Sequence, residues 1–405
     1  MSMACKFEFR PGPPPYLQSN CPIESPPPYP SSPPPSPSSP PPPLSPLPPS
    51  HPPSTPPSAP PPPSLYFYVS ADHPAHTEGP ARALRYDPGS DSYLWHDAVN
   101  TGRNGYSLSS VVSSDGYLYI CGGVQRDYKW VYDFSRLALA NFEATGTSTW
   151  EALTDLPSGA TSESPAGVGL SGALMAELNG LIYHMGGRHF SAASGGVWYW
   201  SDEVKAYDPA TQQWSSKASL NIGRMDFRAA VLGGYLYVLG GIKGPPQAIS
   251  LDVERYDPAT NTWTTKASIP EGDNSGVTNR QPSGFGCVVY SGRIYIYGGY
   301  DAANSAWPNY QYTNDILYYD PSSDSWTRLA ASHDMPVSRS NFGYAVSGDR
   351  FYLFAGNTMD SSTHHETAAW YYDATSGTWT QVADLPTSNP SVHSYGDLST
   401  TLQAP

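Results

Sequence analysis

The sequence contains a long stretch without any charge. From Pro26 to Ser64 there is no Asp, Glu, Lys or Arg, and proline and serine make up most of the residues. Such a segment lacks the apolar side chains that a packed core needs. Proline-rich chain instead adopts polyproline II, a left-handed helix that rises about 3.1 Å per residue. We therefore predict a polyproline II rod over residues 25–64.

Basic residues are scarce as well. The chain has 21 Lys and Arg against 35 Asp and Glu, which gives a formal net charge of −14. Binding to a phosphate backbone needs a basic surface, so we expect no nucleic-acid partner. No stretch approaches eighteen consecutive apolar residues, so we expect no membrane-spanning helix. The first twelve residues also lack the apolar run of a signal peptide.

Cysteine is rare, with four residues in the whole chain. Cys5 and Cys21 flank a short loop, and we predict that a disulfide between them closes a small knob over residues 1–24. Cys121 and Cys287 fall in predicted strands far apart in the sequence. We interpret them as buried thiols that act as small apolar side chains.

Tyrosine, tryptophan and glycine are abundant instead, and they recur in a pattern. The chain has 30 Tyr, 11 Trp and 36 Gly, a composition that favours strands and tight turns over helices. Glycine doublets follow one another at spacings of 64, 54, 58 and 57 residues, with a weaker last copy. They are Gly122-Gly123, Gly186-Gly187, Gly240-Gly241, Gly298-Gly299 and Ala355-Gly356.

A second motif follows each doublet, as in "YDPATQQW", "YDPATNTW", "YDPSSDSW" and "YDATSGTW". Asp can accept a hydrogen bond from the backbone two residues further on, and Pro presets φ at the first corner, so the motif predicts a turn between two strands. We interpret Tyr132-Asp133 and Trp150 as a stretched copy with an insertion in its turn. The tryptophan strands then number six, at Trp95, Trp150, Trp214, Trp263, Trp326 and Trp379.

Each glycine doublet is preceded by two apolar runs around a short turn, as in "AVLGGYLYVLGG", the signature of a β-hairpin. Each unit therefore has four strands. Together these motifs resemble the kelch family of β-propellers over about residues 65–400. The resemblance implies an all-β, six-bladed propeller domain over residues 65–405. Its last strand, in "SVHSYGDLSTTLQ", would complete the first blade and remove exposed edges.

One face of such a propeller carries the long loops "RHFSAASGGVWYWSDE", "YDAANSAWPNYQYTND" and "NTMDSSTHHET". The segments that enter the innermost strands add a recurring basic residue to that face. The candidates for a ring of donors at the channel mouth are Arg103, Arg224, Arg228, Arg280, Arg339 and His393. Such a ring could hold a carboxylate or a polar sugar, or it could tie neighbouring blades together structurally. The aromatic residues in these loops could form a contact surface or could pack within their own loops. They are Trp198, Trp200, Trp307 and Tyr310.

The sequence offers little support for the enzymatic chemistries known from kelch propellers. A copper radical oxidase needs two Tyr and two His that converge, and no such set can be placed around His364, His365 and His393. His184 lies in a predicted strand, and we interpret it as a core residue rather than a metal ligand. We predict no catalytic residue, no metal and no cofactor. A mutarotase-like activity, which could use arginines and a few carboxylates, stays open.

The proline-rich blocks, such as "SPPPYP" and "SSPPPPLSP", resemble the hydroxyproline-rich glycoproteins of plant and green-algal walls. The resemblance implies hydroxylation and O-glycosylation. The candidate positions are Pro27, Pro28, Pro34, Pro35, Pro41, Pro42, Pro43, Pro61, Pro62, Ser36 and Ser38. No Asn-x-Ser/Thr sequon with an allowed middle residue occurs, so any glycan would be O-linked. A ligand for an SH3 or WW domain would have similar spacing, but flanking basic residues are lacking.

These features lead to two hypotheses of different class. In the first, the chain is an extracellular structural glycoprotein that assembles head to tail through its proline-rich segment and its propeller into a fibre, wall or surface layer. In the second, it is a secreted propeller that binds or acts on carbohydrate through the arginine ring. The expected partners are other copies of the chain and glycans.

Overall fold

The computed structural model describes thirteen ranges of the chain. They are residues 64–69, 82–97, 105–106, 109–125, 132–140, 150–157, 170–191, 197–244, 248–272, 284–301, 311–358, 367–386 and 398–399. Every described residue lies in the unit Ala59–Pro405. The predicted knob with Cys5 and Cys21, and the rod with its candidate glycosylation positions, lie outside the described residues and stay predictions.

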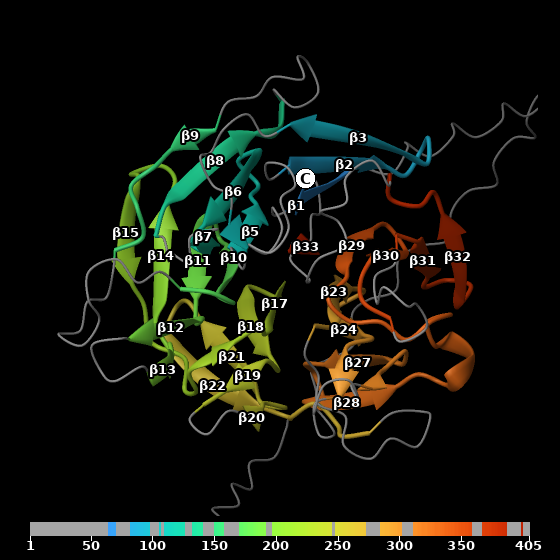
Figure 1. Ribbon diagram of the computed structural model, residues 1–405. Helices are drawn as coiled ribbons and strands as arrows, with labels where there is room; N and C mark the ends of the chain where they lie inside the picture. Colours follow the sequence, from blue (N-terminus) through green and yellow to red (C-terminus); the bar gives the residue numbers. More distant parts are fainter. Residues whose placement is uncertain are drawn as a thin grey trace, which may run out of the picture. The chain divides into compact units, whose positions relative to one another are not determined.

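The described residues form six four-stranded antiparallel sheets (Figure 1). In the first sheet, the order β3-β2-β1-β33 joins Leu65–Val69 (β1), Arg82–Asp87 (β2), Ser92–Asp97 (β3) and Leu398–Ser399 (β33). The second consists of Ser109–Val112 (β5), Tyr117–Cys121 (β6), Phe134–Ala138 (β8) and Glu151–Ala152 (β9). The third consists of Leu174–Leu178 (β10), Leu181–Met185 (β11), Val204–Asp208 (β14) and Gln213–Ser216 (β15).

The other three large sheets follow the same plan of consecutive antiparallel strands. The fourth consists of Arg228–Leu232 (β17), Tyr235–Leu239 (β18), Val253–Asp257 (β21) and Thr262–Lys266 (β22). The fifth consists of Gly286–Tyr290 (β23), Arg293–Tyr297 (β24), Ile316–Asp320 (β27) and Ser325–Arg328 (β28). The sixth consists of Gly343–Ser347 (β29), Arg350–Phe354 (β30), Ala369–Asp373 (β31) and Thr378–Val382 (β32).

Short strands extend the loops at the ends of the large sheets. They are Gly105–Tyr106 (β4) with Val124–Gln125 (β7), Arg188–Ser191 (β12) with Val197–Trp200 (β13), Arg224–Met225 (β16) with Ile242–Lys243 (β19) and Ala248–Ile249 (β20), and Tyr300–Asp301 (β25) with Gln311–Tyr312 (β26). A 3-10 turn covers Ala331–His333. The expectation of an all-β chain is confirmed for the described residues, none of which forms a helix long and apolar enough to cross a membrane.

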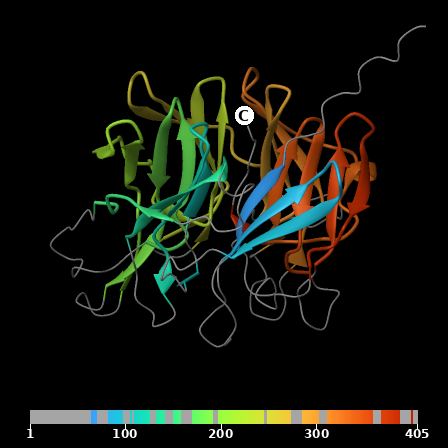
Figure 2. The ribbon, with the colours of Figure 1, turned by 90° about the horizontal axis from the view of Figure 1, so that it is seen from above.

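The first strand of each sheet contacts the first strand of the next. The contacts run from β5 to β10, β17, β23 and β29, and then through β33 and β1 back to β5. Figure 2 shows the blue and cyan strands of the first sheet between the green sheets and the orange-red ones. The sheet that joins the two ends of the chain contains β33, whose Leu398 and Ser399 pair with Val69 and Tyr68 of β1.

The repeated turn forms as its chemistry predicts. The Oδ1 atoms of Asp208 and Asp257 each accept the backbone N–H two residues further on, at 2.9 Å. The tryptophan on the fourth strand of the sheet then donates its indole N–H to a carbonyl oxygen of the segment that follows the preceding sheet, as Trp263 does to Ala218 O at 2.8 Å. The motif therefore makes both a turn and a tie between sheets.

The second glycine of a doublet is needed where the chain passes close to the segment that enters the first strand of the same sheet. Gly241 has a φ of 90°, and a Cβ added there would lie 2.6 Å from the carbonyl oxygen of Met225. Any larger residue would therefore combine a strained backbone with a steric clash. Gly187 occupies the same place in the third sheet, with a φ of 94°.

Two expectations about the first copies of the repeat are wrong. In the first sheet, Tyr93 rather than Trp95 takes the place of the tryptophan, because Tyr93 pairs with Tyr86 as Trp214 pairs with Tyr207. The Tyr93 hydroxyl also donates across to Ala383 O at 2.7 Å. The register therefore makes Tyr93, seven residues after Tyr86, the match to the other repeats.

Tyr132-Asp133 is likewise not a turn with an insertion. These residues precede β8, and Asp133 O accepts the N–H of Gly122 at 3.1 Å. Asp252 O accepts the N–H of Gly240 at the same distance. Asp133 thus stands where a strand begins, and the insertion lies after β8.

The two remaining cysteines are buried thiols, as predicted. Cys121 lies in β6 and Cys287 in β23, and each side chain is 1% exposed. Burial raises the pKa of Cys287 to about 12, so this thiol stays protonated at neutral pH.

Candidate functional site

Several of the predicted site residues lie outside the described ranges, and nothing can be said of their positions: Arg103, Arg280, His393, Trp307 and Tyr310. The described candidates are Arg224, Arg228, Arg339, Trp198 and Trp200. Arg224, Arg228 and Arg339 lie where an innermost strand begins, and Trp198 and Trp200 lie in β13, after the end of β11. Arg228, for example, opens β17 and pairs with Leu239 at the end of β18.

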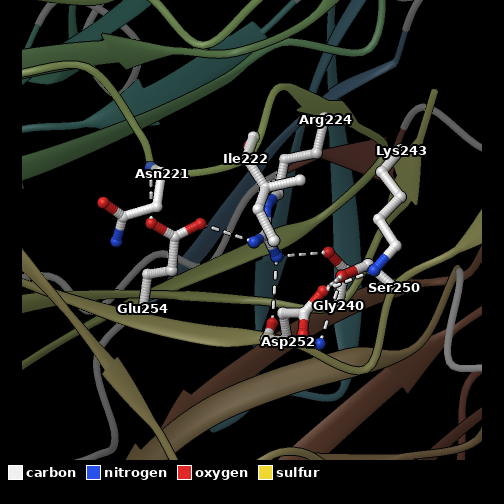
Figure 3. Close-up of polar contacts among 8 residues, drawn as sticks. All are labelled: Asn221, Ile222, Arg224, Gly240, Lys243, Ser250, Asp252 and Glu254. Carbon is white, nitrogen blue, oxygen red and sulfur yellow. Dashed lines mark hydrogen bonds and ion pairs between the residues drawn. The ribbon is translucent and has the colours of Figure 1, made fainter. Parts of the chain in front are cut away.

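Arg224 is completely buried and its donors are occupied (Figure 3). It forms an ion pair with Glu254 of β21, and its Nη1 donates to Gly240 O and Asp252 O at 2.9 Å each. The second carboxylate oxygen of Glu254 accepts the N–H of Asn221 at 2.7 Å. Burial lowers the pKa of Arg224, whereas the charges of Glu254 and Asp252 oppose that shift.

The main chain of Arg224 forms a hydrogen bond with the third sheet. Arg224 O accepts the N–H of Gly187 at 2.8 Å, and Gly187 belongs to the third sheet, whereas Gly240 and Glu254 belong to the fourth. Arg339 repeats this arrangement: its carbonyl accepts from Gly299 and its Nη1 donates to Ala355 O and Ala368 O. The structural alternative for the arginine ring therefore accounts for both residues, whose side chains are 0% and 3% exposed.

A partly exposed network continues outward from Asp252. Its Oδ2 accepts from Lys243 Nζ at 2.8 Å and from Ser250 Oγ at 2.7 Å (Figure 3). Although burial acts to raise it, the pKa of Asp252 is lowered, because Lys243 and Ser250 stabilise the carboxylate. This network links β16 and β19 to the fourth sheet.

Arg228 differs from Arg224 because it is half-buried and lies over aromatic rings. Its Nε donates to Phe285 O at 2.8 Å and its Nη1 to Phe227 O at 3.1 Å. Its guanidinium carbon lies 5.8 Å from the ring centre of Phe285 and 5.4 Å from that of Tyr344. Since Tyr344 belongs to β29, this cation reaches from the fourth sheet across to the sixth.

The sequence did not single out Asp226 or Arg188. Asp226 lies two residues before Arg228 and donates its N–H to Gly172 O, and Arg188 pairs with the adjacent Ser171. Asp226 is exposed to solvent, and the positive charges of Arg188 and Arg228 act to lower its pKa. Arg188 opens β12, and its guanidinium lies over the ring of Trp198, 4.3 Å from its centre. These three residues are named the Arg188–Asp226–Arg228 cluster below.

The aromatics of the hairpin β12–β13 have different surroundings. Trp198 lies against Arg188, and Tyr199 stacks on His189 with ring centres 5.2 Å apart. Trp200 packs on Gly244, where an added Cβ would lie 2.7 Å from its ring. Trp200 therefore fits loop packing, whereas Trp198 belongs to the charged cluster.

Chemically, the cluster offers two guanidinium groups, one carboxylate and aromatic faces. Guanidinium groups bind carboxylate, sulfate or phosphate oxygens through paired N–H donors. The described ranges contain no group of three or more His, Cys, Asp or Glu side chains that could hold a metal ion. The arrangement can thus bind an anionic or polar ligand.

Comparison with known proteins agrees with the repeat pattern. Residues 226–402 match the family model "KLHDC2/KLHL20/DRC7 Kelch-repeats domain". These residues are therefore similar to a kelch-repeat domain. The all-β kelch fold expected from the glycine doublets and turns is thus confirmed, with four-stranded antiparallel sheets of the kind that form propeller blades.

Proteins similar to this chain include viral and fungal ones. It is 27% identical over 178 residues to a cowpox virus "Kelch repeat and BTB domain-containing protein 1", covering 44% of this chain and 28% of that protein. It is 26% identical over 299 residues to the "Kelch-like protein terF" of Aspergillus terreus, covering 72% of this chain and 56% of that protein. The chain thus spans 28% of the length of the viral relative and 56% of the length of the fungal one.

A solved structure supports the fold alone. "Structure of YjhT" superposes with a TM-score of 0.52 at 18% sequence identity, covering 69% of this chain and 84% of the other. This similarity in fold covers more of the chain than residues 226–402.

Proposed function

We propose that this chain is an extracellular structural glycoprotein that assembles through its proline-rich segment and its kelch propeller into a fibre, wall or surface layer. The observation that carries the proposal is the uncharged segment Pro26–Ser64 in front of a kelch domain. A segment of this length and composition suits an extended, O-glycosylated rod better than a short linker. In an extracellular assembly, the rod and the domain both take part in contacts between copies of the chain.

In this proposal the six sheets are the blades of one six-bladed propeller. The cyclic contacts between first strands and the pairing of β33 with β1 support that arrangement. Buried ties such as Arg224–Glu254 make the blades a rigid platform. A rigid platform and a long rod on one chain permit head-to-tail contacts, which build filaments when they do not close.

Assembly is tested with the natural, glycosylated protein. Light scattering and electron microscopy at increasing concentration should show fibres or sheets for the full chain, and single particles for a chain lacking residues 25–64. Intact-protein mass spectra should show a ladder of pentose and hexose additions, located on that segment. Single particles at every concentration, with no such ladder, would overturn the proposal.

The Arg188–Asp226–Arg228 cluster favours a second candidate function, a secreted propeller that binds or acts on carbohydrate. Its guanidinium groups lie beside the rings of Trp198 and Tyr344. Sugars combine polar edges with apolar faces, which such a combination of donors and rings can contact. Arg188→Gln should then abolish binding on a glycan array without a loss of stability. If the wild-type chain binds no glycan, this second candidate fails.

A further inference from the structure

A tyrosine and an arginine lie against each other at the same place in four sheets. One of them is the first residue of the second strand, and the other is the middle residue of the third strand. The guanidinium carbon lies 4.2–4.5 Å from the ring centre in every pair. The pairs are Tyr117–Arg136, Tyr235–Arg255, Arg293–Tyr318 and Arg350–Tyr371, in the second, fourth, fifth and sixth sheets. Tyrosine comes first in two sheets and arginine in the other two, so the pair itself is what repeats.

The paired side chains are partly exposed and keep unused donors. Within the described ranges, the hydroxyls of Tyr235, Tyr318 and Tyr371 form no hydrogen bond. The Nε atom of Arg255 is buried without a hydrogen-bond partner in the same ranges. The face at the start of the second strands therefore presents aromatic rings together with N–H and O–H donors.

The carboxylates two residues beyond these pairs are already occupied. Asp257 and Asp373 each accept backbone N–H groups of their own turn at 2.9 Å. Asp320 accepts the N–H of Ser322 at 3.0 Å and pairs with Arg293 at 3.2 Å. A ligand on this face thus meets rings and donors, but few acceptors for N–H groups of its own.

A proline-rich chain has the complementary chemistry. Proline has no N–H, and polyproline II leaves its carbonyl oxygens without internal hydrogen bonds. Grooves lined by aromatic side chains bind such chains. Charge favours the same ligand, because two copies with a net charge of −14 repel each other, whereas Pro26–Ser64 carries no charge.

The proline-rich segment also joins the domain at this row of residues. Leu65 of β1 pairs with Tyr86, as Leu236 of β18 pairs with Tyr256. Ser64, the last residue of the segment, therefore occupies in the first sheet the place of Tyr235 in the fourth. A polyproline II rod is stiff over several residues, so residues 25–50 would lie about 45 Å or more from this junction. That distance suits contact with the same face of a second copy.

We propose that the tyrosine–arginine pairs of the fourth, fifth and sixth sheets bind residues 25–50 of a second copy in polyproline II conformation. These sheets follow one another, since β17 contacts β23 and β23 contacts β29, whereas the third sheet has Leu181 and Ala206 at the paired positions. Tyrosine rings pack on proline rings, and the hydroxyls and guanidinium groups donate to carbonyl oxygens. This inference rests on the proposed assembly and names its contact surface.

The first test titrates a fluorescently labelled, unmodified peptide of residues 25–50 with the full chain and follows its anisotropy. Wild type should bind the peptide. A peptide with alanine in place of every proline should bind at least tenfold more weakly, because it is not preorganised as polyproline II. Equal binding of both peptides would show that the face does not recognise polyproline II.

Tyr235→Phe, Tyr318→Phe and Tyr371→Phe each remove a hydroxyl but keep the ring and its contact with arginine, so the fold is retained. Each should weaken peptide binding about fivefold, the effect of one lost hydrogen bond. Tyr199→Phe is the matched control, because Tyr199 lies in β13, beyond the opposite end of the strands, and its substitution should leave binding unchanged. If all four variants bind like wild type, the peptide binds elsewhere and the inference is wrong.

Sedimentation of the full chain at increasing concentration tests the second copy. Wild type should associate, excess peptide should dissociate it, and the chain with all three substitutions should associate on the order of a hundredfold more weakly. If the peptide binds only to a chain lacking residues 25–64, the segment occupies the face of its own copy, and the contact between copies is refuted.

The proposed function and this inference can fail separately. Fibres of the natural protein that form equally well with all three substitutions would rule out this surface and leave assembly in place. If the peptide binds to this face but the full chain never associates, assembly fails, and the second copy fails with it as the ligand. If neither binding nor association is observed, both are overturned.

Discussion

At the scale of single residues, the guanidinium of Arg224 is held by one carboxylate and by carbonyl oxygens within the fold. Both members of the Arg224–Glu254 pair are at most 1% exposed. Replacing one partner of a buried pair leaves the other charge without compensation, which is costly in a medium of low polarity. The pair therefore contributes to the junction between the third and fourth sheets only while it is intact.

We predict that Glu254→Gln lowers the free energy of unfolding by about 3 kcal/mol, because the buried cation of Arg224 loses its counter-charge. Urea denaturation measures the loss. Lys243→Gln is the control: its pair with Asp252 is partly exposed and should contribute about 0.5 kcal/mol. Equal losses in the two variants would show that the buried pair has no special role.

His184 of β11 makes stability depend on pH. It is 2% exposed, and burial lowers its pKa from 6.5 to about 4. The unfolded chain therefore binds a proton at higher pH than the folded chain does. Stability should be constant above pH 6.5 and should fall as the pH drops toward 4, by about 3 kcal/mol from this residue.

The measurement compares urea denaturation of wild type and His184→Leu between pH 7 and pH 4. The carboxylates contribute equally to both curves, so the difference between them isolates His184. The wild type should lose more stability than the variant over this range. Parallel curves would contradict the assignment of this pH dependence to His184.

At the scale of elements, one turn residue ties each of three sheets to its neighbour. Asn261 Oδ1 accepts from the Tyr256 hydroxyl at 2.8 Å and from the N–H of Ala218, in the segment after β15, at 2.9 Å. Asp324 does the same with Tyr319 and Ala267, and Asp91 with Tyr86 and Ala383. The indole of Trp263 closes the tie by donating to Ala218 O.

We predict that Asn261→Ala costs about 2 kcal/mol, because two hydrogen bonds are lost and an alanine must adopt a φ of 53°. Asn261→Asp should change stability little, since aspartate fills the equivalent place at 91 and 324. Urea denaturation of both variants provides the measurement. If the aspartate variant is as unstable as the alanine variant, the tie depends on something other than the oxygen acceptor.

The strands were predictable from sequence because their signals are local. An aspartate that binds two residues ahead, a following aromatic and a glycine doublet each act within a few residues. The cluster around Asp226 was not predictable in this way. Bringing Arg188 to Asp226 requires the pairings of Ser171 with Arg188 and of Gly172 with Asp226, which join two sheets.

Arg224 and Arg228 show the same limit within five residues of sequence. Both are basic residues before or at the start of one inner strand, and the same two alternatives, ligand binding or a structural tie, are open for each from sequence alone. In the structure, Arg224 points into the fold toward Glu254, and Arg228 lies over Phe285 and Tyr344. Tertiary packing, and not residue type, decides which of the two can meet a ligand.

At the scale of the whole kelch domain, the ends of the chain meet in one sheet. β33 pairs with β1 and contacts both β29 and β5. Without it, β1 would present an unpaired edge and the contacts between the first and second sheets would be reduced. The stability of the domain should therefore depend on a strand that lies more than three hundred residues from its partner.

We predict that a chain ending at Pro386 is less stable than the full chain by about 2 kcal/mol, because the hydrogen bonds between β33 and β1 are lost. A chain ending at Ser399 retains β33 and is the matched control, with expected stability equal to that of the full chain. Hydrogen exchange of peptides that cover Leu65–Val69 should become faster in the shorter chain alone, since Tyr68 and Val69 lose their partners. Exchange of β17 and β18, on the other side of the ring of sheets, should change less. Unchanged protection of β1 in the chain ending at Pro386 would mean that the sheets hold together without closure by β33.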